Sequence, residues 1–182
     1  VKSFPRVLRI EPASQCNLAC THCPTGTTTL ERGLMSNLTF SRVLQDLRKH
    51  KDAIDVVVLY HGGEPQLNKN FFDWTHRVRE IKPEIFIKSV TNGMLLNQQN
   101  IEKTVLSSLD LIEISLDGTG PKDNELIRKN SNSGKVVKNI KGLISARNNA
   151  GSNSGLQLVP SQFYEGATKE ISPRHVGKKR IR

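Results

Sequence analysis

The chain has 182 residues, of which 36% are hydrophobic and 24% are charged, and its formal net charge is +10. This length and composition are typical of a soluble globular domain with a substantial core, and they exclude an intrinsically disordered chain. No apolar run approaches the roughly 18 to 20 residues that cross a bilayer, and the N-terminal stretch lacks the apolar core of a secretory signal, so we expect a cytoplasmic protein.

The positive charge is concentrated at the C-terminal end. Residues 167–182 hold six Lys or Arg against one Glu, which gives this segment half of the net charge. We interpret it as a solvated, disordered basic tail that follows one domain formed by residues 1–166. A phosphate-binding arm is the alternative, but no aromatic residues are interleaved with the basic ones, so we do not expect nucleic-acid binding.

Short β-branched segments alternate with amphipathic segments along the chain. Strands are expected at 7–10, 56–60, 85–90, 111–116 and 156–159. Helices are expected from residue 38 with Thr39 as the N-cap, from about 70 to before Pro83, over 100–106 and over 135–149. This alternation predicts an α/β fold with a parallel sheet, built as a partial barrel of about five βα units.

All three cysteines lie within eight residues, directly after the first expected strand. Cys16, Cys20 and Cys23 follow the spacing C-x3-C-x2-C, which makes a poor disulfide framework but suits zinc or an iron–sulfur cluster. His22 could supply a fourth zinc ligand, although its place between Cys20 and Cys23 would crowd the loop. A cluster held by three thiolates instead leaves one iron open to a small-molecule ligand.

Glycine-rich or polar segments follow the next three expected strands. They are GGEP at 62–65, TNG at 91–93 and SLDG at 115–118. The C-terminal ends of parallel strands meet at one rim, where functional groups lie in folds of this kind. We therefore expect these segments and the cysteine loop to form one site.

The three cysteines, followed by GGEP, TNG and SLDG in this order, resemble the radical S-adenosylmethionine (SAM) superfamily over roughly residues 5–160. Residues 24–26 and 33–36 are similar to maturases that carry a SPASM-type C-terminal domain. No cysteine follows Cys23 in the sequence, so we do not expect that cysteine-rich domain in this chain. The resemblance implies a barrel of the radical SAM type, and because that barrel usually has six βα units, we expect the domain to be incomplete at its C-terminal end.

The resemblance also implies the ligands. By it, Cys16, Cys20 and Cys23 bind a [4Fe-4S] cluster whose fourth iron binds SAM. The residues implied to contact SAM are His22, Gly62, Gly63, Glu64, Asn92, Ser115 and Arg128. Asp117 is expected either to contact the ribose or to cap its own turn, and no catalytic residue is expected beyond the cluster ligands.

The implied function is that of a radical SAM enzyme, with oxidoreductase chemistry. The reduced cluster cleaves SAM to a 5′-deoxyadenosyl radical, which abstracts hydrogen from a peptide or small-molecule substrate. An external electron donor of the flavodoxin or ferredoxin type is implied, and no membrane partner is expected. The alternative is a truncated, non-catalytic α/β module that binds an iron–sulfur cluster or zinc.

Overall fold

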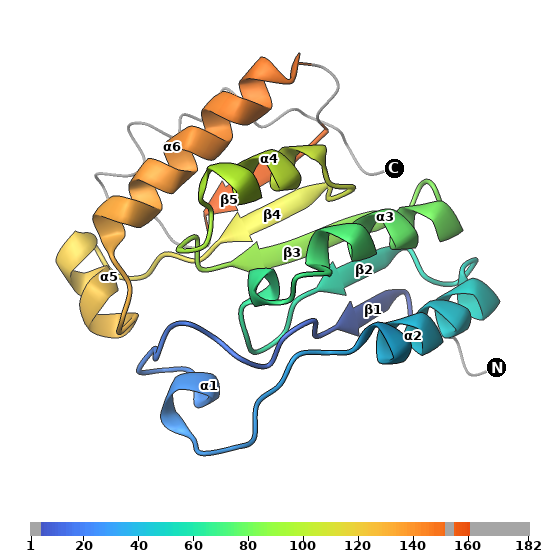
Figure 1. Ribbon diagram of the computed structural model, residues 1–182, viewed down its shortest axis with the longest axis horizontal. Coiled ribbons are helices and arrows are strands. Elements are labelled where there is room, and N and C mark those ends of the chain that lie inside the picture. The colour runs from blue at the N-terminus through green and yellow to red at the C-terminus, as the bar shows by residue number, and fades with distance from the viewer. Residues whose placement is uncertain (1–4, 152–154, 161–182) are drawn as a thin grey trace.

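The computed structural model describes residues 5–151 and 155–160 (Figure 1). The strands are β1 (Val7–Ile10), β2 (Val56–Leu59), β3 (Phe86–Thr91), β4 (Leu111–Ile114) and β5 (Gln157–Pro160). The helices are α1 (Pro24–Thr27), α2 (Asn37–His50), α3 (Phe71–Ile81), α4 (Gln98–Leu106), α5 (Pro121–Ile127) and α6 (Ser133–Asn149), with a 3₁₀ turn, η1 (Pro65–Leu67). The expected basic tail at 167–182 lies outside the described residues.

The strands form one parallel sheet in the order β1-β2-β3-β4-β5. Val7 of β1 lies opposite Val56 of β2, which in turn lies opposite Phe86 of β3. Because connections between neighbouring parallel strands are right-handed, the connecting helices lie on the same face of the sheet, as Figure 1 shows for α2, α3, α4 and α6. The predicted α/β fold with a parallel sheet in a partial barrel is confirmed.

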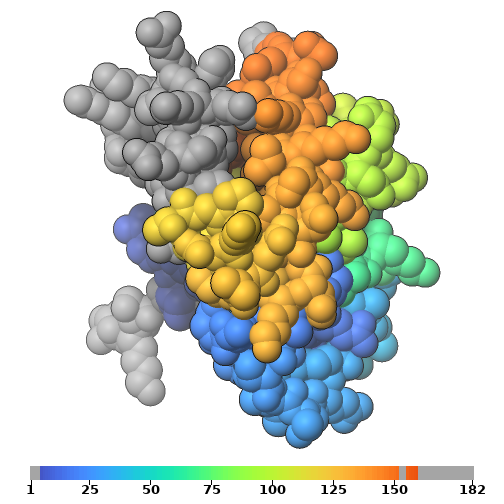
Figure 2. Space-filling model, turned by 90° about the vertical axis from the view of Figure 1, so that its left-hand side faces the viewer, coloured from blue at the N-terminus to red at the C-terminus, as the bar shows by residue number. Residues whose placement is uncertain are grey.

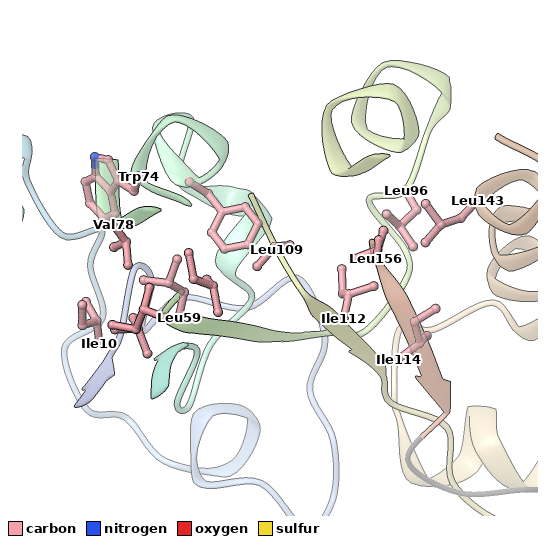
Figure 3. Close-up of a cluster of buried hydrophobic side chains, with 14 of the residues drawn as sticks. Ile10, Leu59, Trp74, Val78, Leu96, Leu109, Ile112, Ile114, Leu143 and Leu156 are labelled. Carbon is pink, nitrogen blue, oxygen red and sulfur yellow. The ribbon is translucent and has the colours of Figure 1, made fainter. Parts of the chain in front are cut away.

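The hydrophobic core lies between the sheet and these helices (Figure 3). Leu59 of β2 and Trp74 of α3 are fully buried in it. The rings of Phe40 and Trp74 stack with centroids 4.1 Å apart, and the indole N–H donates to Asn37 Oδ1 at 2.8 Å. Aromatic pairs contribute about 0.5–1.5 kcal/mol beyond their buried area, so this contact holds α2 firmly against α3.

The prediction of Thr39 as an N-cap is wrong. The helix begins at Asn37, and the hydroxyl of Ser36 accepts the backbone N–H of Thr39 at 3.1 Å. Ser36 has the extended backbone of an N-cap (φ −78°, ψ 156°), which brings its oxygen to the first free N–H groups of the helix.

Three short elements were missing from the sequence prediction. They are α1, η1 and α5, and each carries a proline in its first turn. Proline suits a helix start because its φ is already helical and its missing N–H would have no partner there. None of the three is long enough for an apolar periodicity to identify it.

Within the described ranges, no helix combines the length and the apolar character needed to cross a membrane. The cytoplasmic location stays a prediction.

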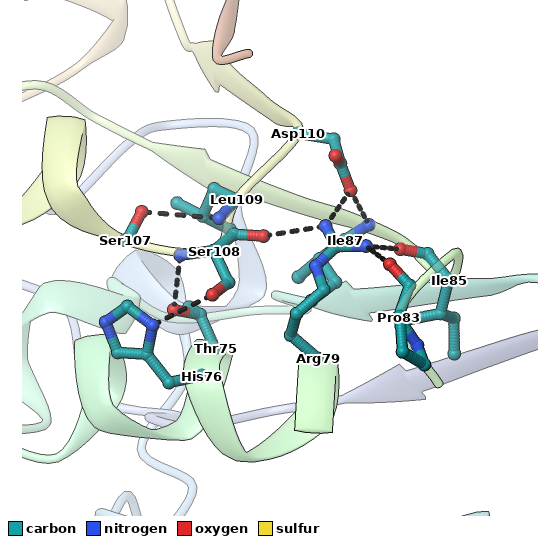
Figure 4. Close-up of polar contacts among 10 residues, drawn as sticks. All are labelled: Thr75, His76, Arg79, Pro83, Ile85, Ile87, Ser107, Ser108, Leu109 and Asp110. Atoms are coloured by element: carbon teal, nitrogen blue, oxygen red, sulfur yellow. Dashed lines mark hydrogen bonds and ion pairs between the residues drawn. The ribbon is translucent and has the colours of Figure 1, made fainter. Parts of the chain in front are cut away.

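Arg79 bridges the end of α3 to the starts of β3 and β4 (Figure 4). Its guanidinium donates to the carbonyls of Pro83 (2.7 Å), Ile85 (2.5 Å) and Ser108 (3.0 Å) and to the carboxylate of Asp110 (2.6 Å). The same oxygen of Asp110 accepts the backbone N–H of Ile87 at 2.7 Å. One planar, multidentate cation therefore connects three segments at the end of the sheet opposite the cysteine loop.

We expect Arg79→Lys to lower the free energy of unfolding by about 2 kcal/mol, because a single ammonium cannot reach all four acceptors and leaves carbonyls unpaired. The matched control is Arg77→Lys in the same helix, where one hydrogen bond to Ser41 (2.9 Å) and a contact over the Phe40 ring are at stake. Urea denaturation of both variants measures the difference. Equal losses would show that the Arg79 network contributes no more than an ordinary surface contact.

Candidate functional site

One pocket opens at the C-terminal ends of the strands, with a volume of about 450 Å³ that includes space open to solvent. Ten of the eleven residues singled out from the sequence line it, all except Asp117: Cys16, Cys20, His22, Cys23, Gly62, Gly63, Glu64, Asn92, Ser115 and Arg128. They come from the loops after four successive strands and from the end of α5. The expectation that these segments share one site is therefore confirmed in space, while their ligand contacts stay predictions.

Two of the three thiols receive hydrogen bonds from the protein. Cys16 Sγ accepts the N–H of Leu18 at 3.4 Å and the side-chain amide of Asn92 at 3.7 Å. Cys20 Sγ accepts from the guanidinium of Arg128 at 3.9 Å. Burial raises the pKa of both thiols, and these donors oppose that rise because they stabilise the thiolate. The pocket thus supplies donors to the form of sulfur that binds metal.

The cysteine loop is attached to the segment at the end of α5. The N–H groups of Ala19 and Thr21 donate to the carbonyls of Lys129 (3.0 Å) and Ile127 (2.9 Å). Figure 2 shows α5 lying against the N-terminal segment that contains α1. These backbone bonds bring Arg128, which is 108 residues away along the chain, next to Cys20.

The GGEP loop is bonded to the chain on both sides of the cysteines. Gly62 donates its N–H to Glu11 Oε1 at 2.7 Å, and its carbonyl accepts the hydroxyl of Thr25 at 2.7 Å. The N–H of Glu64 donates to the carbonyl of Gln15 at 2.8 Å. The loop therefore positions the cysteine segment through its backbone, before any ligand is considered.

The side chain of Glu64 is buried, with 1% of its surface exposed. Its carboxylate accepts the N–H of Asn92 (2.8 Å), the hydroxyl of Thr91 (3.0 Å) and the N–H of Gln66 (3.2 Å). Burial raises the pKa of Glu64 to about 7, although the three donors pull it downward. Since its contacts are with the protein itself, this carboxylate joins the loop after β2 to the end of β3.

Arg128 and Asp117 form an ion pair at the pocket wall. Arg128 Nε lies 2.7 Å from Asp117 Oδ2, and the side chains are 12% and 20% exposed. Both atoms are buried, and among the described residues neither makes a hydrogen bond in addition to this ion pair. In the same turn, Asp123 accepts the N–H of Thr119 at 3.1 Å, so the capping role considered for Asp117 belongs to Asp123.

His22 lies at the rim of this pair. Its Nε2 is 4.0 Å from Asp117 Oδ2, and 54% of its side chain is exposed. Within the described residues, no group of three or more His, Cys, Asp or Glu side chains is arranged to hold a single metal ion. Zinc and an iron–sulfur cluster therefore both stay predictions. The three thiols line one pocket, two of their sulfurs accept hydrogen bonds, and the Arg128–Asp117 ion pair lies beside them.

Sequence reasoning missed several residues of the site. Tyr60 and Val90 also line the pocket, and Glu11 holds the GGEP loop from the end of β1. Strand alternation could have identified Tyr60 and Val90, because residues two apart share a face of a strand. Glu11 gave no such signal, since its partner Gly62 is 51 residues away.

We expect Gly63→Ala to destabilise the protein by about 2 kcal/mol or more, because the new Cβ would overlap the backbone carbonyl oxygens of Ala13 and Gln15. These atoms belong to the segment that leads into the cysteines, so the site should be displaced as well. Gly33→Ala is the control, since a Cβ there meets nothing within 4 Å. Thermal unfolding of the two variants compares them, and equal melting temperatures would contradict the assigned contact.

We expect Glu64 to make stability depend on pH. Its pKa is about 7 in the folded protein and ordinarily 4.5, so between these values the folded state holds a proton that the unfolded state has released. The contribution of Glu64 to the free energy of unfolding should therefore fall by roughly 3 kcal/mol as the pH rises through this range. The difference between wild type and Glu64→Gln, measured by urea denaturation at several pH values, isolates this term. A difference that stays constant with pH would contradict it.

A family model described as the radical SAM superfamily matches residues 10–161. The chain is 28% identical over 160 residues to the tungsten-containing aldehyde ferredoxin oxidoreductase cofactor-modifying protein of Pyrococcus furiosus, a match that covers 85% of this chain and 43% of that protein. It is 27% identical over 143 residues to the mycofactocin maturase MftC of Mycobacterium ulcerans, covering 78% and 37%. The chain thus spans less than half the length of these relatives.

Solved structures agree on the fold. SuiB of Streptococcus suis superposes with a TM-score of 0.68 at 20% identity, over 93% of this chain and 36% of that one. The structure of anSMEcpe with bound AdoMet superposes with a TM-score of 0.63 at 20% identity, over 87% and 52%. The family model covers most of the chain, and its match includes every segment that lines the pocket. The chain belongs to the radical SAM superfamily.

Proposed function

We propose that this chain is the core of a radical SAM enzyme that binds a [4Fe-4S] cluster through Cys16, Cys20 and Cys23 and holds SAM beside it. The observation that carries the proposal is the single pocket lined by the three thiols and by every residue implied to contact SAM. Membership of the radical SAM superfamily supports the interpretation of this pocket as a site for a cluster and SAM. When bound, the reduced cluster supplies the electron that cleaves SAM and yields a 5′-deoxyadenosyl radical.

The protein's own groups account for binding and orientation. The guanidinium of Arg128 lines the pocket beside Cys20, and this cation is suited to the carboxylate of SAM. Asp117 pairs with the guanidinium at 2.7 Å and holds it in place. Ser115 donates its N–H to the carbonyl of Thr91 at 2.9 Å, which places it at the same rim.

The half-buried wall of the pocket favours a ligand with a planar ring. His22 and Tyr60 both line it, and burial raises the pKa of Tyr60, which keeps its hydroxyl protonated at neutral pH. Flat side chains of this kind can pack against the adenine of SAM and limit the access of water. Leu18 and Val90 add apolar surface.

We further propose a peptide or small-molecule substrate and an external flavodoxin- or ferredoxin-type electron donor. A second SuiB structure contains the precursor peptide SuiA, and the relative MftC is named a maturase of mycofactocin. These names describe those proteins, and they support the class of substrate here without identifying it. Fold alone does not select the substrate, because specificity depends on side chains around the open part of the site.

Anaerobic reconstitution with iron and sulfide tests the proposal. We expect about four irons per chain, as a three-thiolate [4Fe-4S] site requires, and a change in the EPR spectrum of the reduced protein when SAM is added. With dithionite, SAM should be cleaved to 5′-deoxyadenosine, which chromatography quantifies. Cys20→Ala should abolish both results because one iron loses its ligand, whereas Thr29→Ala, an exposed change in the segment after α1, should leave both intact.

Two outcomes would support the alternative of a non-catalytic module. Stoichiometric zinc with no response to SAM would exclude the cluster. A normal cluster that binds SAM but never produces 5′-deoxyadenosine would show that the site assembles but does not catalyse the cleavage of SAM.

A further inference from the structure

The side-chain amide of Asn92 is committed to the protein at both ends. Its Nδ2 donates to Asn17 Oδ1 at 2.8 Å and to Cys16 Sγ at 3.7 Å. Its Oδ1 accepts the backbone N–H of Met94 at 3.0 Å. A primary amide has two N–H donors, and both are used here.

These partners determine which way the amide faces. The backbone N–H of Met94 can only donate, so it requires the oxygen of Asn92 and leaves the nitrogen facing Asn17 and Cys16. The reversed amide would place donor against donor at Met94. The orientation of the N–H that donates to Cys16 is therefore determined by contacts that do not involve the sulfur.

The backbone of Asn92 is held from the opposite side. Its N–H donates to the buried carboxylate of Glu64 at 2.8 Å, and the same carboxylate accepts the hydroxyl of Thr91. The next residue, Gly93, has a φ of +75° and turns the chain away from β3. Asn139 of α6 donates to the carbonyl of Gly93 at 2.8 Å and fixes this turn from the helix side.

We propose, on the basis of the proposed function, that Asn92 is a positioning residue that tunes the cluster through Cys16 and not a contact of SAM. Its amide donates to the ligand sulfur, and Glu64 sets its position through the backbone. A hydrogen bond to a ligand sulfur stabilises the extra negative charge of the reduced cluster, so it raises the reduction potential. Asn92 therefore makes the cluster easier to reduce.

The test measures the midpoint potential of the reconstituted cluster without SAM, by EPR-monitored redox titration. The proteins are wild type, Asn92→Ala, Asn92→Asp and Asn139→Ala. Asn92→Ala should shift the potential to a more negative value because the donor is lost. Asn92→Asp should shift it further, because it keeps the acceptor for Met94 but places a carboxylate beside the sulfur. Resonance Raman spectra should show a matching change in the iron–thiolate stretching bands.

Asn139→Ala is the matched control. It removes a buried amide of α6 that donates to the carbonyl of Gly93 in the same turn, and this hydrogen bond involves no sulfur. It should leave the potential unchanged. A shift as large as that of Asn92→Ala would mean that the turn merely loosens, and this would overturn the proposal.

Other outcomes separate this inference from the proposed function. If wild type takes up no cluster, the proposed function fails. If wild type takes up the cluster and Asn92→Ala has the wild-type potential but binds SAM more weakly, Asn92 is a SAM contact and the tuning role is wrong. If neither Asn92 variant retains a cluster that Asn139→Ala retains, Asn92 is needed to build the site, which also overturns the tuning role.

Discussion

The buried carboxylate of Glu64 is the contact on which the assembled site depends. It extends from the loop after β2 and accepts the N–H of Asn92 and the hydroxyl of Thr91 at the end of β3. The backbone N–H of Glu64 donates to the carbonyl of Gln15, just before the cysteines. A charged group removed from water is costly unless donors surround it. Because two of its donors come from the end of β3 and the third from its own loop, satisfying the carboxylate also holds these two parts of the rim together.

A second set of contacts closes the other side of the pocket. The backbone bonds from the cysteine loop to residues 127 and 129 bring Arg128 beside Cys20, and Asp117 after β4 holds its guanidinium. The contacts of Glu64 therefore hold the site on one side, and the guanidinium of Arg128 lies beside Cys20 on the other. Cys20 receives a charged donor, Arg128, whose charge is paired with Asp117, while Cys16 receives neutral donors.

Contacts at the opposite end of the sheet keep the strands in register. The Arg79 network ties α3 to the starts of β3 and β4, and the stacked pair of Phe40 and Trp74 holds α2 to α3. None of these groups lines the pocket. A rigid base and a rim built from loops are the general arrangement of parallel α/β folds, where the chemistry lies at the C-terminal ends of the strands.

The sequence by itself determined the fold class, the five strands and the long helices, because apolar periodicity is a local signal. The resemblance of its motifs to the radical SAM superfamily then pointed to ten of the residues that line the pocket. The sequence could not reveal the short proline-started helices, the N-cap at Ser36 or the partners of Glu64, Asn92 and Asp117. The tertiary structure alone decided these, since each hydrogen-bonding group selects a partner by its position in space, and Asn92 and Cys16 are 76 residues apart along the chain. A motif can therefore place Asn92 at the site, but only the folded chain shows that its amide faces the sulfur.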